Sequence, residues 1–210
     1  MDDDSQLVNW WESKLRLAEE HTAEQQLWLI EEWRKRGWRI FSGNLIFDDI
    51  RDQQLGRDGY LALRHPDKGV RTIRVEYKWR SQLKPDLLLE EGSFWTHSEA
   101  NPCPWEPWTR KKGADILVYS WQRSHPHGPI HHAYWMKPLL EHFWVNIDRW
   151  PVKWAYTKRN RHSWWTKNRL VPLAEVAPFL FARTWDPRID TGETIIDFST
   201  LSEEDHLNGY

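Results

Sequence analysis

The stretch "RTIRVEYKWR", residues 71–80, alternates apolar and charged side chains along its length. Three apolar residues stand at every second position: Ile73, Val75 and Tyr77. Residues two apart in a β-strand point to the same face of the sheet. The stretch is therefore predicted to be a strand with its apolar face in the core, and with Glu76 and Lys78 side by side on the other face.

A shorter run, "DGYLAL" (58–63), precedes this strand and is joined to it by "HPDKG" (65–69), whose Pro, Asp and Gly are typical of a turn. The two runs are predicted to form a hairpin, which would bring Asp58 towards Glu76. Two carboxylates at one sheet edge suit a hard divalent cation such as Mg²⁺, which takes oxygen ligands and keeps several waters. A neighbouring lysine could hold a phosphate oxygen or the attacking water by its charge.

Asp58 and the triplet Glu76-Tyr77-Lys78 resemble the signature of the PD-(D/E)XK nuclease superfamily, in which an acid opens one strand and an acid-x-Lys motif follows on the next. The resemblance covers about residues 15–180. It implies an α/β fold with a restriction-endonuclease-like core, in which helices flank a mixed central sheet. It also implies metal-dependent hydrolysis of phosphodiester bonds, with DNA as the expected substrate and Mg²⁺ or Mn²⁺ as the cofactor.

Many members of the family add a glutamate from the helix that precedes these strands. Residues from about 5 to 36 have the apolar spacing of a helix, and Gly37 follows as a stop signal. Glu24 is the candidate for this role because it lies three and four residues before Leu27 and Trp28, at the border of the apolar face. Glu20 and Glu31 share the same stripe and remain alternatives. The site implied by the resemblance consists of Asp58, Glu76 and Glu24 as metal ligands, with Lys78 as the catalytic cation.

Apolar runs and turn residues predict the other elements. They are a strand at 38–47, a long loop at 81–113, a buried strand at 114–121, a further strand at 131–137, a helix begun by Pro138 and a closing segment at 169–180. We expect one nuclease-like domain over residues 1–185, followed by an acidic arm at 186–210.

The net charge of −2 is unevenly distributed along the chain. Residues 186–210 hold seven acids and one arginine and carry −6, which leaves +4 on residues 1–185. Residues 151–170 contain six Lys or Arg side chains among several aromatic rings, and no acid. Such a stretch is typical of nucleic-acid binding. The residues expected to contact nucleic acid are Lys153, Lys158, Arg159, Arg161, Trp164, Trp165 and Lys167, and Lys111 and Lys112 could contact the phosphate backbone.

Seventeen tryptophans are an unusually high number for a chain of this length. Four of them stand in apolar patterns and are expected in the core: Trp28, Trp33, Trp121 and Trp144. Three others stand among the cations and could stack on bases: Trp154, Trp164 and Trp165. Stacking on sugar rings, as in a carbohydrate-binding module, is the alternative, although such binding does not require the cations.

Several other candidate sites have simpler interpretations. Cys103 is the only cysteine, which excludes an intramolecular disulfide and a multi-cysteine zinc site. Four histidines could bind a metal, but the surrounding prolines and glycine favour a polar loop: His125, His127, His131 and His132. Three acids could replace Asp58 at the metal, but a solvated turn accounts for them as well: Asp48, Asp49 and Asp52.

No apolar run approaches the roughly 20 residues that cross a bilayer, and the acidic stretch "MDDDSQLVNWWESK" (1–14) lacks the features of an export signal. We therefore expect no membrane partner and a cytoplasmic location. A homodimer that cuts both strands is compatible with this interpretation. Two other functional classes remain open, namely a catalytically inactive relative that binds DNA and a protein-interaction module.

Overall fold

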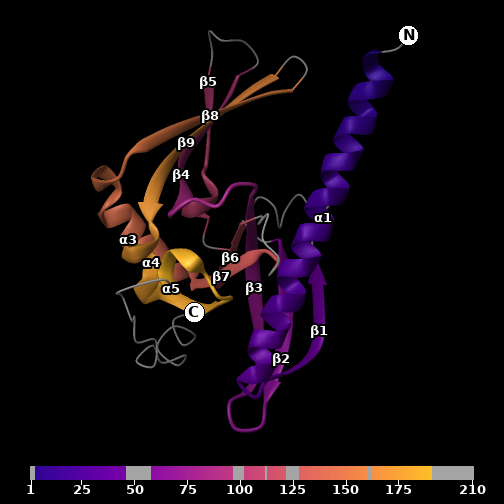
Figure 1. Cartoon of the computed structure of the whole chain (residues 1–210), viewed down its shortest axis with the longest axis vertical. Helices are drawn as coiled ribbons and strands as arrows, with labels where there is room; N and C mark the ends of the chain where they lie inside the picture. Colours follow the sequence, from indigo (N-terminus) through magenta and orange to yellow (C-terminus); the bar gives the residue numbers. More distant parts are fainter. Residues whose placement is uncertain are drawn as a thin grey trace.

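The computed structural model describes residues 3–45, 58–96, 102–111, 113–121, 128–159 and 162–190. These residues form two sheets with helices beside them (Figure 1). The first sheet has six strands in the order β1-β2-β3-β6-β7-β10, and the second has four in the order β5-β4-β9-β8. The fold is α/β with a mixed central sheet, as the sequence predicts, together with a smaller sheet that the sequence does not predict.

The strands are β1 (Arg39–Leu45), β2 (Gly59–His65), β3 (Gly69–Arg80), β4 (Asp86–Thr96), β5 (Pro102–Trp105), β6 (Ile116–Trp121), β7 (Ile130–Trp135), β8 (Val152–Arg159), β9 (His162–Pro172) and β10 (Leu180–Arg183). The α-helices are α1 (Asp3–Lys35), α3 (Met136–Val145), α4 (Leu173–Val176) and α5 (Pro187–Asp190), and the 3₁₀ turns are η1 (Trp108–Arg110), η2 (Ile147–Arg149) and η3 (Ala177–Phe179).

Helix α1 covers one face of the first sheet. Its Leu29 and Trp33 are fully buried in a core that includes Val75 of β3 and Val118 of β6. The helix ends at Lys35, and Gly37 then takes a φ of 82°, which glycine adopts at little cost. The predicted helix and its stop are thus confirmed. Although α1 has 33 residues, no described helix is long and apolar enough to span a bilayer.

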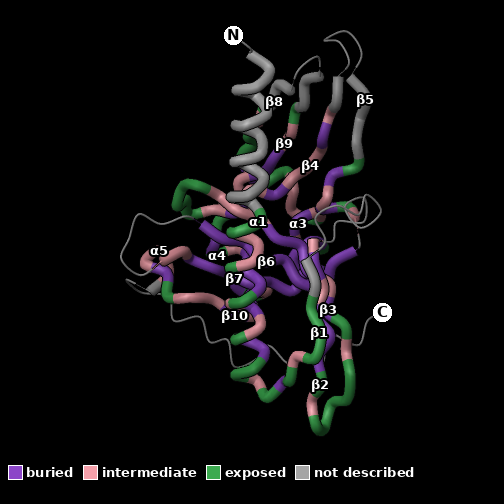
Figure 2. Tube along the Cα trace, turned by 90° about the vertical axis from the view of Figure 1, so that its right-hand side faces the viewer, coloured by how far each residue is buried: buried purple, intermediate pink, exposed green. Residues whose placement is uncertain are grey.

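The predicted hairpin is confirmed, and it forms part of an antiparallel meander of β1, β2 and β3. The alternation along β3 is also confirmed, because the side chains of Ile73, Val75 and Tyr77 are buried beneath α1. On its other side β3 pairs in parallel with β6, so that Glu76 is opposite Leu117. Figure 2 shows the result: β6 and β7 are buried along their length, while the turn between β2 and β3 is exposed.

The connection from β3 to β6 was predicted to be a loop, and this prediction is wrong. It contains β4, β5 and η1, and β4 pairs along most of its length with β9. Leu87 and Leu89 of β4 are fully buried, as is Val171 of β9. The pairing joins segments about 80 residues apart, and a bulge at Glu90/Gly92 interrupts the alternation that would mark a strand locally.

The face of the first sheet opposite α1 is covered by α3 and by part of the second sheet. Leu117 and Tyr119 of β6 lie in one core with Leu139 and Phe143 of α3. The helix begins at Met136 rather than at the predicted Pro138. The backbone N–H of Met136 donates to the carbonyl of Asp115 at 2.9 Å, which ties the first turn of α3 to the start of β6.

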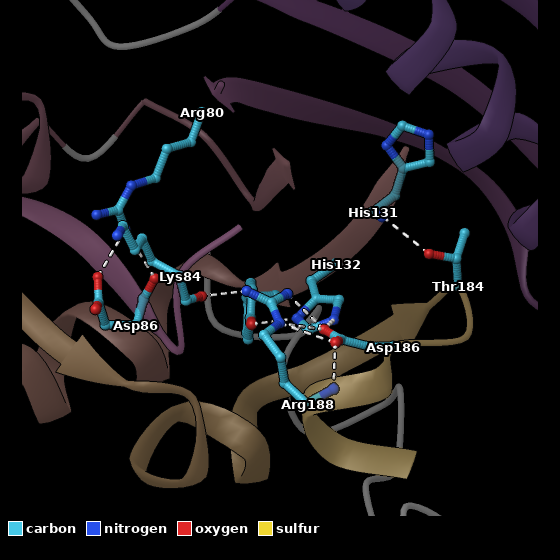
Figure 3. A network of polar contacts seen from close by, with 9 residues as sticks. Arg80, Lys84, Asp86, His131, His132, Thr184, Asp186 and Arg188 are labelled. Atoms are coloured by element: carbon cyan, nitrogen blue, oxygen red, sulfur yellow. Dashed lines mark hydrogen bonds and ion pairs between the residues drawn. The ribbon is translucent and has the colours of Figure 1, made fainter. Parts of the chain in front are cut away.

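Two of the histidines expected in a polar loop, His131 and His132, are buried in β7, so that prediction is wrong for them. His132 Nε2 lies 2.9 Å from Asp186 Oδ2, and both side chains are fully buried. Arg188 also contacts Asp186, with its Nε 2.8 Å from Oδ1 (Figure 3). Asp186, the first residue of the expected acidic arm, is therefore an anchor in the core. His125, His127 and residues 191–210 lie outside the described residues.

Candidate active site

The hairpin brings Asp58 beside the Glu76 end of β3. The backbone N–H of Asp58 donates to the Val75 carbonyl at 2.9 Å, and the Asp58 carboxylate accepts a hydrogen bond from the Tyr77 N–H at 2.8 Å. The next residue, Gly59, is opposite Val75, and the Asp58 carboxylate lies close enough to the Glu76 carboxyl group for its charge to act on it. Asp58, Glu76 and Lys78, predicted from sequence, are thus brought together.

Glu76 and Lys78 form an ion pair on this face through Glu76 Oε1 and Lys78 Nζ. The Glu76 side chain is only 3 % exposed, whereas that of Lys78 is 32 % exposed. The second carboxylate oxygen of Glu76, Oε2, is buried and has no hydrogen-bond partner among the described residues. A buried carboxylate oxygen without a partner is costly, so this atom marks a place where a ligand or cation would be stabilising.

The second sheet contributes a carboxylate that sequence reasoning missed. Glu90 of β4 lies close enough to Lys78 and Glu76 for their charges to act on one another. Ser93, also on β4, is buried and close to Glu90. An acid at the end of the apolar run "LLLE" was the available signal for Glu90, but only the pairing of β4 with β9 places it near β3.

The segment after β5 supplies two further groups. The Lys78 ammonium lies 5.2 Å from the ring centroid of Trp108, within the range of a cation–π interaction. Lys111 is close enough to Glu76 and Glu90 to influence the pKa of both carboxyl groups. Lys111, one of the two lysines expected to contact phosphate, therefore lies beside the candidate site, while Lys112 lies outside the described residues.

Burial and like charge perturb the carboxyl groups. Burial raises the pKa of Glu76 above its ordinary value, and the Asp58 carboxylate adds to this effect, although Lys78 opposes it. Burial likewise raises the pKa of Glu90, again against the influence of Lys78 and Lys111. Three carboxylates share the site with two lysines, so fully ionised side chains leave an excess of negative charge that a divalent cation would offset.

Lys78 remains a cation in this setting. Burial alone lowers the pKa of its ammonium, but the carboxylates of Glu76, Asp58 and Glu90 outweigh that effect and raise the pKa well above its ordinary value. A lysine held in this way supplies a fixed positive charge at neutral pH and does not serve as a proton acceptor.

Glu24, expected as a further ligand, is not part of this group. Its neighbour Gln25 is buried and donates from Nε2 to the Lys78 carbonyl at 2.9 Å and to Ser120 Oγ at 2.7 Å, on the sheet face that α1 covers. The side chains of Glu76 and Lys78 point to the opposite face. Glu24 is exposed, and its charge acts on His21.

The other charged residues of β3 are engaged elsewhere. Arg74 binds the Asp115 carboxylate, with Nε 3.0 Å from Oδ2, and Arg80 pairs with Asp86 at 2.6 Å. The predicted charged face of β3 is thus divided into separate ion pairs, and only its middle part belongs to the site.

Strands β8 and β9 of the second sheet contain the residues expected to contact nucleic acid, except Arg161, which lies outside the described residues. Lys153 is exposed, Trp165 is 40 % exposed, and Lys167 pairs with Glu91 at 2.5 Å. The other expected contacts lie outside the described side chains: Lys158, Arg159, Arg161 and Trp164. The same is true of the alternative metal acids Asp48, Asp49 and Asp52, and of Cys103.

The donor atoms of the site fit a hard divalent cation. Among the described residues, no three His, Cys, Asp or Glu side chains are grouped closely enough to enclose a metal ion. Mg²⁺ does not require such a cage, because it is usually bound by one or two carboxylates together with waters and substrate phosphate. Asp58 and Glu76 provide such a pair, and the partnerless Glu76 Oε2 is available to it.

Comparison with known proteins assigns no family to this chain. No family model matches it, and no curated protein or solved structure matches it either.

Proposed function

We propose that the protein is a metal-dependent nuclease of the PD-(D/E)XK type, which hydrolyses phosphodiester bonds in DNA with Mg²⁺ or Mn²⁺. The observation that carries the proposal is the convergence of Asp58, Glu76 and Lys78 on one face of the hairpin, with a buried carboxylate oxygen of Glu76 left without a partner among the described residues.

The order of elements supports the restriction-endonuclease-like fold. The family's order is a helix, a three-strand meander, a second helix and a further strand. Helix α1 likewise precedes an antiparallel three-strand meander, and β6 lies parallel to β3. The chain departs from that plan in the connection before β6, where β4, β5 and η1 replace the expected helix. This departure brings Glu90 and Trp108 to the site.

Asp58 and Glu76 would hold the cation, which lowers the pKa of a bound water and offsets charge on the phosphate. Lys78, kept charged by its neighbours, would bind a phosphate oxygen and stabilise the negative charge that develops there. Glu90 has a raised pKa and is a stronger base than an ordinary glutamate, so it would accept a proton from an attacking water. The Trp108 ring would limit the access of other water.

Plasmid cleavage tests the proposal. Purified protein with Mg²⁺ is expected to nick or linearise plasmid DNA, and chelator or Lys78→Ala is expected to abolish cleavage while the variant stays folded. Lys68→Ala, in the exposed turn of the hairpin, is the matched control and should cleave normally. Glu90→Gln should reduce cleavage strongly, whereas Glu24→Gln should retain it because Glu24 lies on the helix that covers the other face. Cleavage that persists in Lys78→Ala would contradict the mechanism.

An inactive nuclease-fold protein that binds DNA is the second candidate. The observation in its favour is that Lys78 already pairs with Glu76 Oε1, so that the cation of the motif neutralises its acid. In that case the wild-type protein would bind DNA, and neither Mg²⁺ nor Mn²⁺ would produce breaks.

A further inference from the structure

The β8–β9 hairpin carries an exposed apolar surface that the candidate active site does not use. Four of its large apolar side chains are at least 40 % exposed: Val152, Trp154, Tyr156 and Trp165. Large apolar side chains gathered on one surface mark an interaction site more often than chance. Figure 1 shows β8 and β9 running together with β4 away from the helices α3 and α4.

The aromatic rings share one face. Phe94 of β4, Trp165 of β9 and Tyr156 of β8 are successive register partners, so their side chains point to the same side, and Trp154 lies two residues from Tyr156 on that side. We call the side formed by these four rings the aromatic face. Tyr156 and Trp165 have ring centroids 4.4 Å apart, and Phe94 and Trp154 have theirs 6.0 Å apart.

The charge of the hairpin indicates which class of ligand would bind the aromatic face. Residues 151–170 carry six cations and no acid, and the exposed Lys153 precedes Trp154 on β8, with its side chain on the other side of the strand. Glu91 of β4 pairs with Lys167 and Arg169, which still leaves the hairpin strongly positive. A ligand that complements this positively charged hairpin and its exposed rings has negative charge and flat apolar groups. Single-stranded nucleic acid has both, in its phosphates and its unpaired bases.

We infer that the aromatic face binds single-stranded nucleic acid by stacking unpaired bases on its rings. In a duplex the base faces are already stacked on one another, so only an unpaired segment can offer them to tryptophan and tyrosine. The hairpin cations would neutralise the phosphates of the same segment.

The position of the face relative to the candidate site extends the inference to the substrate. Glu90 and Phe94 belong to the same strand, four residues or roughly 13 Å apart at the usual rise of a strand. Register places Phe94 on the side of β4 away from Ser93, so a bound strand would reach the site around the edge of the second sheet. If the protein is the nuclease proposed above, this arrangement favours substrates with a single-stranded segment next to the scissile phosphate.

Fluorescence anisotropy with labelled oligonucleotides in EDTA tests the binding without cleavage. The probes are a 20-nucleotide oligothymidylate and a 20-base-pair duplex, each at low and high salt. Trp154→Ala and Trp165→Ala should each weaken oligothymidylate binding about tenfold. Trp165→Phe should restore most of the affinity. Trp185→Ala is the matched control, because Trp185 is 52 % exposed but lies outside the hairpin.

The inference is supported if the single strand binds more tightly than the duplex, if binding weakens with salt, and if only the hairpin substitutions reduce it. Equal binding of both probes, or undiminished binding by both alanine variants, overturns it. Binding to anionic lipid vesicles or formation of a dimer that depends on Trp154, without binding of oligothymidylate, also overturns it. Because binding is measured in EDTA, a wild-type protein that binds oligothymidylate but never cleaves refutes only the proposed function.

Discussion

Replacing Lys78 by methionine tests whether Glu76 and Lys78 act as a buried charge pair. Methionine keeps most of the volume of the lysine stem, but it removes the ammonium that faces Glu76 Oε1 and lies over the Trp108 ring. The Glu76 carboxylate is then left buried, close to Asp58 and without its main neutralising partner.

The size of the expected loss in unfolding free energy follows from the exposure of the Glu76 and Lys78 side chains. Removing one partner of a fully buried ion pair costs roughly 3–5 kcal/mol of unfolding free energy. Lys78 is 32 % exposed, so solvent screens part of the interaction, and we expect a cost of about 2–3 kcal/mol at pH 8. The double variant Glu76→Gln/Lys78→Met removes both charges and should cost no more than about 1 kcal/mol.

The cost should depend on pH because Glu76 can take up a proton. Burial raises the pKa of Glu76 in the folded protein, and loss of Lys78 removes a group that lowers it. A carboxyl group with a raised folded pKa contributes stability below its unfolded pKa, and that stability is lost as the pH rises through the folded pKa. Lys78→Met should therefore be closer to wild type at pH 5 than at pH 8.

Urea unfolding followed by tryptophan fluorescence measures these differences, since the chain has 17 tryptophans. Lys68→Met, at an exposed turn, is the control and should stay within about 0.5 kcal/mol of wild type. If the cost of Lys78→Met is the same at pH 5 and pH 8, or if the double variant loses the sum of both single losses, Glu76 and Lys78 do not form the coupled pair described here.

Two further predictions concern the core beneath the candidate site. Burial lowers the pKa of His131 to about 4, and the nearby His132 contributes, so the unfolded chain binds a proton there more readily and the contribution of His131 to stability should fall by about 3 kcal/mol between pH 7 and pH 4. His131→Asn should flatten that part of the pH profile in urea titrations, and an unchanged slope would exclude His131 as its source. Trp33→Ala should cost roughly 3–5 kcal/mol because Trp33 is fully buried between α1 and the sheet. Leu27→Ala, on the same helix but 65 % exposed, should cost less than about 0.5 kcal/mol in the same measurement, and equal costs would contradict the placement of α1.

The hairpin and the first helix could be predicted because their signals are local. The alternation along β3 and the turn residues at 65–69 each depend on neighbours within a few positions, as does the apolar spacing of α1. Once the hairpin is specified, its register places Asp58 beside Glu76, and the side-chain period of two places Lys78 with them. The core of the candidate site was therefore accessible from the sequence.

The sequence could not decide which further glutamate lies beside Asp58, Glu76 and Lys78 in the candidate site. A helical stripe indicates which side of α1 faces the sheet, but it does not say which face of the sheet the helix covers. The tertiary structure puts Glu24 and the side chains of Glu76 and Lys78 on opposite faces. Glu90 takes the nearby position instead, because β4 crosses over β6 and pairs with β9.

By itself the sequence determined the elements whose hydrogen bonds and apolar faces are set by near neighbours: α1, the β2–β3 hairpin, β6 and β7. Only the tertiary structure decided the second sheet, the burial of His132 with Asp186, and the approach of Glu90 to Lys78. These features join residues far apart in the chain, and their stability comes from pairing and desolvation that exist only when both partners are in place. A pattern of neighbouring residues does not indicate which distant residue will be the partner.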